Sequence, residues 1–374
     1  MLLFTAFAFA WLFWFQADIL ATVQHALSNG QTHYNRTVGA LIITAVLLLV
    51  HFITFAATRL ARRTHALTYL PSMLLLAFIS SIGTPFTWGA WLWAAPLILI
   101  LWSGAVWLAR QMLPMGDEGR LTAGFLSRQM WINIAQMCVM MLCVAAVSNT
   151  NAVEHYKARM ERELTEGDAA KALSIGSRSL ETDESLTMLR IFALSSEGQL
   201  AERLFDYAIS GTSADMLPMA GSRSRLTMMP DSLLWQHFGV SPDSIAARAD
   251  STTGSARHAL SVSQYLDSLA TDTLATAAHR DYRLMGMLID RSIDTFVVTL
   301  PRYYALAADS LPRHYREALV LYQQTRDTMF AYEDTLMLRR WHTFLQYDSI
   351  YIKPTERKIR TEGEYRGTYW YYFY

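Results

Sequence analysis

The chain has 374 residues, of which 52% are hydrophobic, and its 32 acidic residues balance its 32 basic residues. This length predicts two units rather than one, and the charges divide the same way. Residues 1–150 contain three acidic residues, seven arginines and no lysine, whereas residues 151–374 hold the other 29 acidic residues and 25 basic ones. Neither half has the basic excess that phosphate contacts need, so the composition argues against nucleic-acid binding.

Apolar runs in the first half are long enough to cross a bilayer as helices, which takes about 20 residues. We expect a transmembrane domain over residues 1–150 with spans near 2–21, 38–57, 66–82, 89–109 and 128–148. The first run has no basic segment before it, which favours an uncleaved span over a signal peptide. Cys138 and Cys143 lie in the last span, where we expect them to be packing residues.

The arginines predict the orientation of these spans. Arginine-rich loops stay in the cytoplasm, and six of the seven arginines lie in the loops after the second and fourth spans: Arg59, Arg62, Arg63, Arg110, Arg120 and Arg128. We therefore expect a bacterial inner-membrane protein with a cytoplasmic amino terminus and residues 151–374 in the periplasm.

The polar stretch QHALSNGQTHYNR, residues 24–36, joins the first two expected spans on the outer side. A short interfacial helix from Ile19 to Leu27 would end at Asn29-Gly30, where glycine supplies a left-handed turn. We favour a structural interpretation, in which polar groups satisfy one another and the helix ends; its members are Asp18, Gln24, His25, Gln31 and Tyr34. A binding role for Gln31, Tyr34 and Arg36 toward a lipid head group or a partner segment is the second interpretation.

An acidic residue before a polar external loop also resembles, in outline, the lipid-phosphate-dependent membrane glycosyltransferases. That resemblance implies catalytic roles for Asp18, His25 and His33, with the carboxylate acting as a base or helping to hold a metal. The loop has one carboxylate rather than a pair, the spans are fewer, and the second external loop, GTPFTW, adds no acid. These departures make the transferase the alternative hypothesis.

The polar residues within the spans are few. His51 lies in the second span, and Asn133 and Gln136 lie in the fifth. A single histidine without an intramembrane carboxylate or lysine is a poor proton relay, so we expect hydrogen bonds between helices.

The second half has helical periodicity that resembles tetratricopeptide repeats. In EGDAAKALSIGSRSLETD, residues 166–183, small or apolar residues recur at the spacing of one helix face, from Ala169 to Leu180. A further helix pair follows, with its turn at Glu197 and Gly198. The composition of residues 211–256 predicts an irregular excursion with one short helix near Leu233 to Phe238.

Three helices are expected after residue 256: one before Arg291, one from Ile293 to about Leu306, and one from Pro312 to Thr325. They carry a short echo, PRYY (301–304) and PRHY (312–315). Arginine beside tyrosine could form a groove for an anionic or peptide ligand, lined by Arg302, Tyr303, Tyr304, Arg313 and Tyr315. We favour the simpler interpretation that the two arginines cap helix ends or pair with Asp290, Asp294 and Asp309.

The chain ends in GTYWYYFY, whose last six residues are all aromatic. Such a tail would be a liability if it were free in water. We expect it to pack along the concave face of the helical domain or at the membrane surface.

Taken together, the loop QHALSNGQTHYNR, the segments LPRYY and LPRHYREALVLY, and the ending GTYWYYFY resemble an uncharacterised family of bacterial envelope proteins. Residues 243–276 fit this resemblance poorly. The resemblance implies amino-terminal spans, an exported helical-repeat domain, and no assigned reaction.

The sequence thus predicts an all-α protein: a five-helix transmembrane bundle followed by a tetratricopeptide-like α-solenoid over residues 151–374. An extended concave surface suits a segment of another chain, so we expect a scaffold that contacts membrane lipids and binds an envelope protein or peptide. The sequence favours a non-catalytic role, without a cofactor or a metal.

Overall fold

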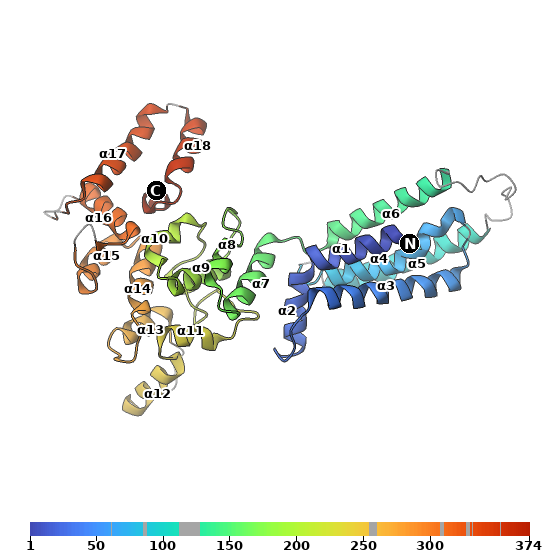
Figure 1. Cartoon of the computed structure of the whole chain (residues 1–374), viewed down its shortest axis with the longest axis horizontal. Coiled ribbons are helices and arrows are strands. Elements are labelled where there is room, and N and C mark those ends of the chain that lie inside the picture. The colour runs from blue at the N-terminus through green and yellow to red at the C-terminus, as the bar shows by residue number, and fades with distance from the viewer. Residues whose placement is uncertain are drawn as a thin grey trace. The chain divides into compact units, whose positions relative to one another are not determined.

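The computed structural model describes residues 1–60, 62–84, 88–111, 128–253, 260–306, 310–326, 330, 332–351 and 353–374, and its regular elements in these ranges are all helices. The chain divides into two compact units, Met1–Asn151 and Ala152–Tyr374, which we call the first and second units. Figure 1 shows the helices of each unit.

The first unit consists mainly of long apolar helices. They are α1 (Leu2–Ala10), which continues as a π-helix (Trp11–Phe15), α2 (Ala17–Leu27), α3 (Arg36–Thr58), a 3-10 helix (Arg62–Tyr69), α4 (Leu70–Ser80), α5 (Trp88–Gln111) and α6 (Arg128–Val147). Three helices are long and apolar enough to cross a membrane, and the bent pair formed by Leu2–Phe15 and Ala17–Leu27 would make a fourth. These lengths are compatible with membrane insertion.

The first expected span is not one continuous helix. The chain bends by 71° between Phe15 and Ala17, directly after the π-helical turn, and π-helical turns are common at such breaks. The bend seats a polar side chain inside the unit: Gln16 is 1% exposed and its amide donates to the carbonyl of Asn149 at 3.2 Å. The span expected near residues 2–21 is therefore a bent helix pair in the structure, with polar Gln16 and Asp18 at the bend.

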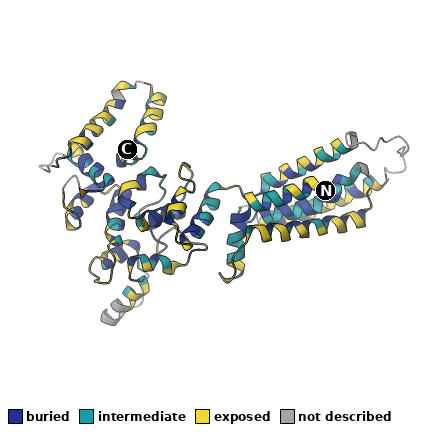
Figure 2. Cartoon of the chain, viewed as in Figure 1, coloured by how far each residue is buried: buried dark blue, intermediate teal, exposed yellow. Residues whose placement is uncertain are grey.

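The outer surface of the first unit is apolar. Large side chains on α3, α5 and α6 are more than half exposed, including Ile42, Leu49, Leu92, Ile100 and Leu142, and Figure 2 shows exposed positions along α3. Extensive apolar exposure of this kind marks a surface made to be covered, as by lipid. Cys138 and Cys143 are also exposed on α6, which corrects the expectation that they pack inside.

Hydrogen bonds between segments join polar side chains within the bundle, as expected. His51 is 3% exposed; its Nδ1 lies 3.4 Å from the Thr68 carbonyl, and its ring stacks on Tyr69 with centroids 3.8 Å apart. Asn133 on α6 accepts the backbone N–H of Ala66 at 2.9 Å. These contacts fix the start of the α4 segment against α3 and α6.

The second unit is a set of shorter helices around one buried core. They are α7 (Ala152–Thr165), α8 (Ala169–Ser174), α9 (Glu184–Ser196), α10 (Leu200–Arg203), α11 (Asp231–Phe238), α12 (Pro242–Thr253), α13 (Val262–Leu269), α14 (Ala278–Ile289), α15 (Ile293–Thr299), α16 (Arg313–Thr325), α17 (Thr335–Ile350), α18 (Pro354–Tyr365) and α19 (Tyr369–Phe373). The core runs without interruption from Val153 on α7 to Trp370 on α19.

Three helices differ from the sequence expectation. α8 ends at Ser174 because Gly176 is left-handed, with φ +59°, and the Tyr156 ring lies within 3.0 Å of the place a Cβ would take there. α15 ends at Thr299, two residues before Pro301, which cannot continue a helix without strain. The excursion at 211–256 contains α12 as well as the expected α11. The sequence signals for the start of α12 were Pro242 at its first position and Asp243 in its first turn.

Two carboxylates order the segment before α11. Glu161 on α7 is fully buried and accepts the backbone N–H groups of Thr227, Met228 and Met229. Asp215 accepts the backbone and side-chain N–H groups of Arg223 at 2.8 and 2.9 Å. This part of the chain lacks long helices, yet side-chain acceptors satisfy its backbone.

Candidate functional site

The loop between α2 and α3 is ordered by a turn and a cap. α2 ends at Leu27 and is followed by Asn29 and Gly30, which both have positive φ, as the sequence predicted. Asn35 then caps α3 by accepting the N–H groups of Thr37 and Val38 at 3.0 and 3.1 Å. Within the loop, Gln24 donates to Thr32 at 2.9 Å.

An ion pair holds the two ends of this loop together. Asp18 at the start of α2 is 1% exposed, and its carboxylate accepts a hydrogen bond from Arg36 at the start of α3 at 2.8 Å. The Asp18 carboxylate is thus already used in a contact that joins α2 to α3. The geometry therefore favours the structural interpretation of Asp18 and weakens the transferase hypothesis.

The other loop residues differ in how far they are buried. His25 is half-buried, with its ring 3.2 Å from the place a Cβ on Gly30 would take, while Gln31 and His33 are exposed. The Tyr34 ring covers Gly39 so closely that a Cβ there would lie 2.5 Å from it. Asp18 and Arg36 are the predicted loop residues that the structure joins in an ion pair.

In the second unit, two of the predicted tyrosines converge on one carboxylate. The Tyr304 and Tyr315 hydroxyls donate to the same oxygen of Asp281 on α14, at 2.7 and 2.8 Å. Tyr315 is fully buried, and burial raises the pKa of both phenols, so both remain neutral donors. These tyrosines fasten α16 and the end of the PRYY segment to α14.

Arg313 is used inside the second unit, with partners other than those expected. Its Nε donates to Glu317 at 2.9 Å, one terminal nitrogen approaches Asp206 at 3.3 Å, and the other donates to the Gly367 carbonyl at 2.7 Å.

The expected acidic partners of the arginines lie elsewhere. Asp290 accepts from Ser213, Asp294 pairs with Arg326 at 2.7 Å, and Asp309 lies outside the described residues. The predicted pairing of Arg313 with Asp290 or Asp294 was therefore wrong, because its partners are Glu317 on its own helix and Asp206 and Gly367 from other segments.

Glu317 is the centre of a buried polar cluster that holds the aromatic carboxyl terminus. Its carboxylate accepts from His314 Nδ1 at 2.9 Å, from Arg313, and from the first backbone N–H of α19, that of Tyr369, at 2.8 Å. Its main-chain carbonyl accepts the Trp370 indole N–H at 2.7 Å. The tail thus packs into the second unit, against α16, with Tyr369 and Trp370 fully buried.

The state of His314 follows from its two partners. Its Nε2 accepts the backbone N–H of Phe205 at 3.4 Å, so the proton of the neutral ring resides on Nδ1, which donates to Glu317. Burial by itself would raise the pKa of Glu317, but the bonds from His314, Arg313 and Tyr369 lower it below its ordinary value. The charged Glu317 carboxylate also faces the amino terminus of α19, which is the positive end of the helix dipole and therefore stabilises a negative charge.

The first half of the echo, in contrast, lies at the surface. Arg302 is exposed and Tyr303 is half-buried. Two apolar side chains lie close to them in the chain, Val298 at 70% exposure and Leu306 at 41%. Val298, Arg302, Tyr303 and Leu306 are thus close together along the chain and at least partly exposed, and we call these four residues the Arg302 strip.

Comparison with known proteins points to the same end of the chain. Residues 242–374 match a sequence family of unknown function, DUF6057. No curated protein and no solved structure matches the chain. The DUF6057 match extends from α12 to α19, so it contains Asp281, the Arg302 strip and the Glu317 cluster, whereas the α2–α3 loop lies outside it.

Sequence reasoning found the arginines and tyrosines of this region but missed their acceptors. Asp281 and Glu317 lie on helices where an acidic residue is ordinary, and Asp206 is 107 residues before Arg313. A weak signal was present for Glu317, because Arg313 precedes it by four residues and His314 by three, and helical neighbours at these spacings share a face.

Proposed function

We propose that this protein is a membrane-anchored adaptor whose second unit binds a segment of another envelope protein. The observation that carries the proposal is the Arg302 strip, an arginine and a tyrosine left at the surface between exposed aliphatic side chains. Arginine and tyrosine are enriched among the residues that dominate binding energy at protein interfaces.

Contacts within the fold hold the tyrosine of the strip in place, which favours binding because less order has to be gained on association. Tyr303 lies edge-on to the His279 ring, with centroids 6.2 Å apart, and its neighbour Tyr304 is fixed by Asp281. The Leu300 carbonyl accepts the backbone N–H groups of both tyrosines at 3.0 Å. The partner segment we propose is therefore one with an acidic group for Arg302 and an apolar side chain for Val298 and Leu306.

The membrane arrangement is part of the proposal. The arginine asymmetry of the loops supports five passes through the bacterial inner membrane, a cytoplasmic amino terminus and a periplasmic second unit. The paired helices of the second unit support a tetratricopeptide-like solenoid, in which stacked helices offer an extended surface to a partner.

Crosslinking at native abundance tests the adaptor role. A photoreactive residue at Val298 is expected to capture a partner, and Arg302→Glu in the same chain should lower the yield by roughly tenfold or more, as the loss of a dominant contact does. The matched control is Arg178→Glu, which reverses another exposed arginine of the second unit and should leave the yield unchanged. Equal yields from the Arg302 and Arg178 variants would refute the proposed surface.

A further inference from the structure

The carboxyl-terminal segment of the second unit differs in charge from the rest of the unit. Residues 335–374, which form α17, α18 and α19, contain seven basic and four acidic residues, whereas residues 151–334 contain 18 basic and 25 acidic ones. The second unit therefore combines an acidic body with a basic carboxyl-terminal segment. An asymmetry of this kind is typical of chains in which one part contacts a negatively charged surface.

The same segment exposes large apolar side chains. Among the described residues of the second unit, nine large apolar side chains are exposed, and five of them lie in the last 40 residues: Leu336, Leu345, Ile350, Ile359 and Tyr374. Apolar side chains interspersed with basic ones are typical of helices that lie on a membrane surface.

The turn between α17 and α18 brings both kinds of side chain together. α17 ends at Ile350 and α18 begins at Pro354, and Figure 1 shows the two helices next to each other. Ile350 is 58% exposed, Lys353 is exposed, and Tyr351 is half-buried against Tyr347, with ring centroids 5.3 Å apart. We call Ile350, Tyr351 and Lys353 the hairpin tip. An aliphatic side chain beside a tyrosine and a lysine suits the boundary between lipid chains and head groups.

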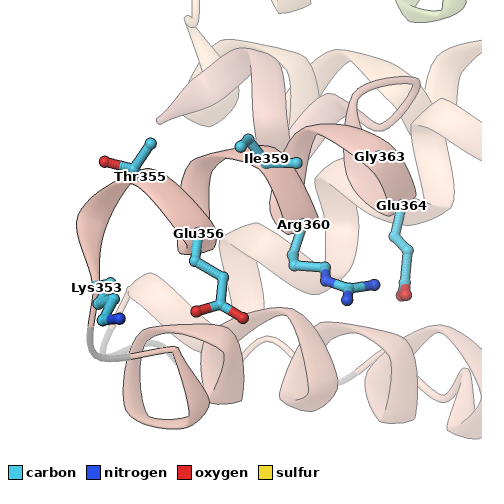
Figure 3. A pocket seen from close by; sticks show the side chains of 7 residues that line it. All are labelled: Lys353, Thr355, Glu356, Ile359, Arg360, Gly363 and Glu364. Carbon is cyan, nitrogen blue, oxygen red and sulfur yellow. The ribbon is translucent and has the colours of Figure 1, made fainter.

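The acidic residues of α18 do not oppose such a contact, because two of them are matched within the hairpin. Figure 3 shows Glu356, Arg360 and Glu364 on one side of α18 and Ile359 on the other. Glu364 is hydrogen-bonded to the hydroxyl of Tyr347 on α17, so the charged side faces α17. The side turned away from α17 carries Ile359, which is 64% exposed.

A phospholipid surface fits this distribution of charge better than a single protein segment does. Exposed basic side chains occur on both helices of the hairpin: Arg339, Arg340, Lys353 and Lys358. Anionic head groups in a bilayer can meet basic groups at many positions, whereas a peptide would have to place an acid opposite each one. The inference rests on the anchoring of the first unit in a bilayer, which keeps the tip at a high effective concentration near lipid.

We propose that the hairpin tip docks on an anionic phospholipid surface, with Ile350 entering the head-group region and the basic side chains contacting lipid phosphates. Each basic residue near such a surface raises the ratio of bound to free tips by about fivefold. The buried aliphatic surface adds to this attraction. Docking would hold the second unit against the bilayer in which the first unit is anchored.

Fluorescence quenching in the full-length protein tests the proposal. In a background with Cys138→Ser and Cys143→Ser, Ile350→Cys carries a fluorescent dye, and the protein is reconstituted into phosphatidylcholine vesicles that contain a spin-labelled lipid, with or without about one-third phosphatidylglycerol. We expect strong quenching in the anionic vesicles and little in the neutral ones. The matched control is Leu274→Cys, whose parent side chain is 65% exposed; it should show little quenching in either. Equal quenching at the two sites, or equal quenching at Ile350 in the two kinds of vesicle, would overturn the proposal.

Removal of one charge then tests the basic side chains. With the dye at position 350, Lys353→Gln should lower the ratio of quenched to unquenched tips by about fivefold in anionic vesicles. Arg178→Gln changes another exposed base of the second unit and should leave the ratio unchanged. An increase in salt from about 0.1 M to about 1 M should also lower the ratio, because the Debye length falls from about 10 Å to about 3 Å. A ratio that neither Lys353→Gln nor salt alters would contradict recognition of lipid charge.

A protein partner would give a different result, because the reconstituted vesicles contain no other protein. Absence of quenching there, with crosslinking of Ile350→Cys to an acidic protein in native membranes, would overturn the lipid proposal. The adaptor role is judged separately, since its test measures crosslinking at the Arg302 strip. Lys353→Gln should leave that crosslinking unchanged, and Arg302→Glu should leave the quenching at Ile350 unchanged.

Discussion

The sharpest test of the internal architecture is Glu317→Gln. The glutamine has nearly the same shape, but it offers one carbonyl oxygen where the carboxylate accepts three hydrogen bonds, from Arg313, His314 and Tyr369. At least one donor is left unsatisfied, and Arg313 loses its fully buried counter-charge. Breaking a buried, hydrogen-bonded ion pair costs about 3 kcal/mol or more.

The consequence should be local, because Glu317 joins α16 to α19. A loss of about 3 kcal/mol would lower the hydrogen-exchange protection of the backbone amides of α19 by about 100-fold, if α19 opens by releasing this contact. Mass spectrometry of peptides that cover residues 367–374 of the full-length protein measures it. Glu197→Gln, at an exposed position, is the control. Protection within about threefold of the parent would refute the assignment of Glu317 as the anchor of the tail.

The same group predicts a pH dependence. The pKa of Glu317 is lowered in the folded protein relative to its ordinary value of 4.5, so the folded state binds its proton less readily than the unfolded state does. The stability that this group contributes is complete above about pH 4.5 and is lost as the pH falls through the lowered folded value. Glu317→Gln should show a smaller loss of stability between pH 5 and pH 3 than the parent; equal losses would contradict this sign.

Two further substitutions test the first unit. Gly39→Ala should lower the free energy of unfolding of the detergent-solubilised protein by about 1–3 kcal/mol, because the added methyl group would lie 2.5 Å from the Tyr34 ring. Gly104→Ala is the control and should not lower it, because nothing lies within 4 Å of the added methyl group there. Equal melting temperatures for these two variants would show that Tyr34 moves freely. Arg36→Gln should destabilise the unit by about 3 kcal/mol because it leaves Asp18 buried without its cation. Adding Asp18→Asn should recover part of this loss. If the effects of the two substitutions simply add in the double variant, the two residues are not coupled.

Much of the helical content follows from sequence patterns, because long apolar runs and three-and-four periodicity are local properties of the chain. Three of the five expected spans contain a single helix long and apolar enough to cross a membrane. The bend at Gln16 is different. The polar Gln16 is visible in the sequence, but its partner at the bend, the carbonyl of Asn149, is 133 residues away and cannot be read from the apolar run itself.

The candidate site shows the same division. The similarity of the PRYY and PRHY segments was visible in the sequence. Their arginines have different surroundings in the fold, because only the second segment is packed against Asp206, Glu317 and α19. Arg302 lies just after the end of α15 at Thr299, in the segment that begins with Pro301, and it is exposed.

An exported second unit is what the adaptor role requires, and labelling in intact cells tests it most directly. In the background without Cys138 and Cys143, a cysteine in place of Leu274, which is 65% exposed, is treated with a maleimide that cannot cross the inner membrane. We predict labelling before lysis that equals labelling after it. Labelling that appears only after lysis would place the second unit in the cytoplasm and contradict the proposed function.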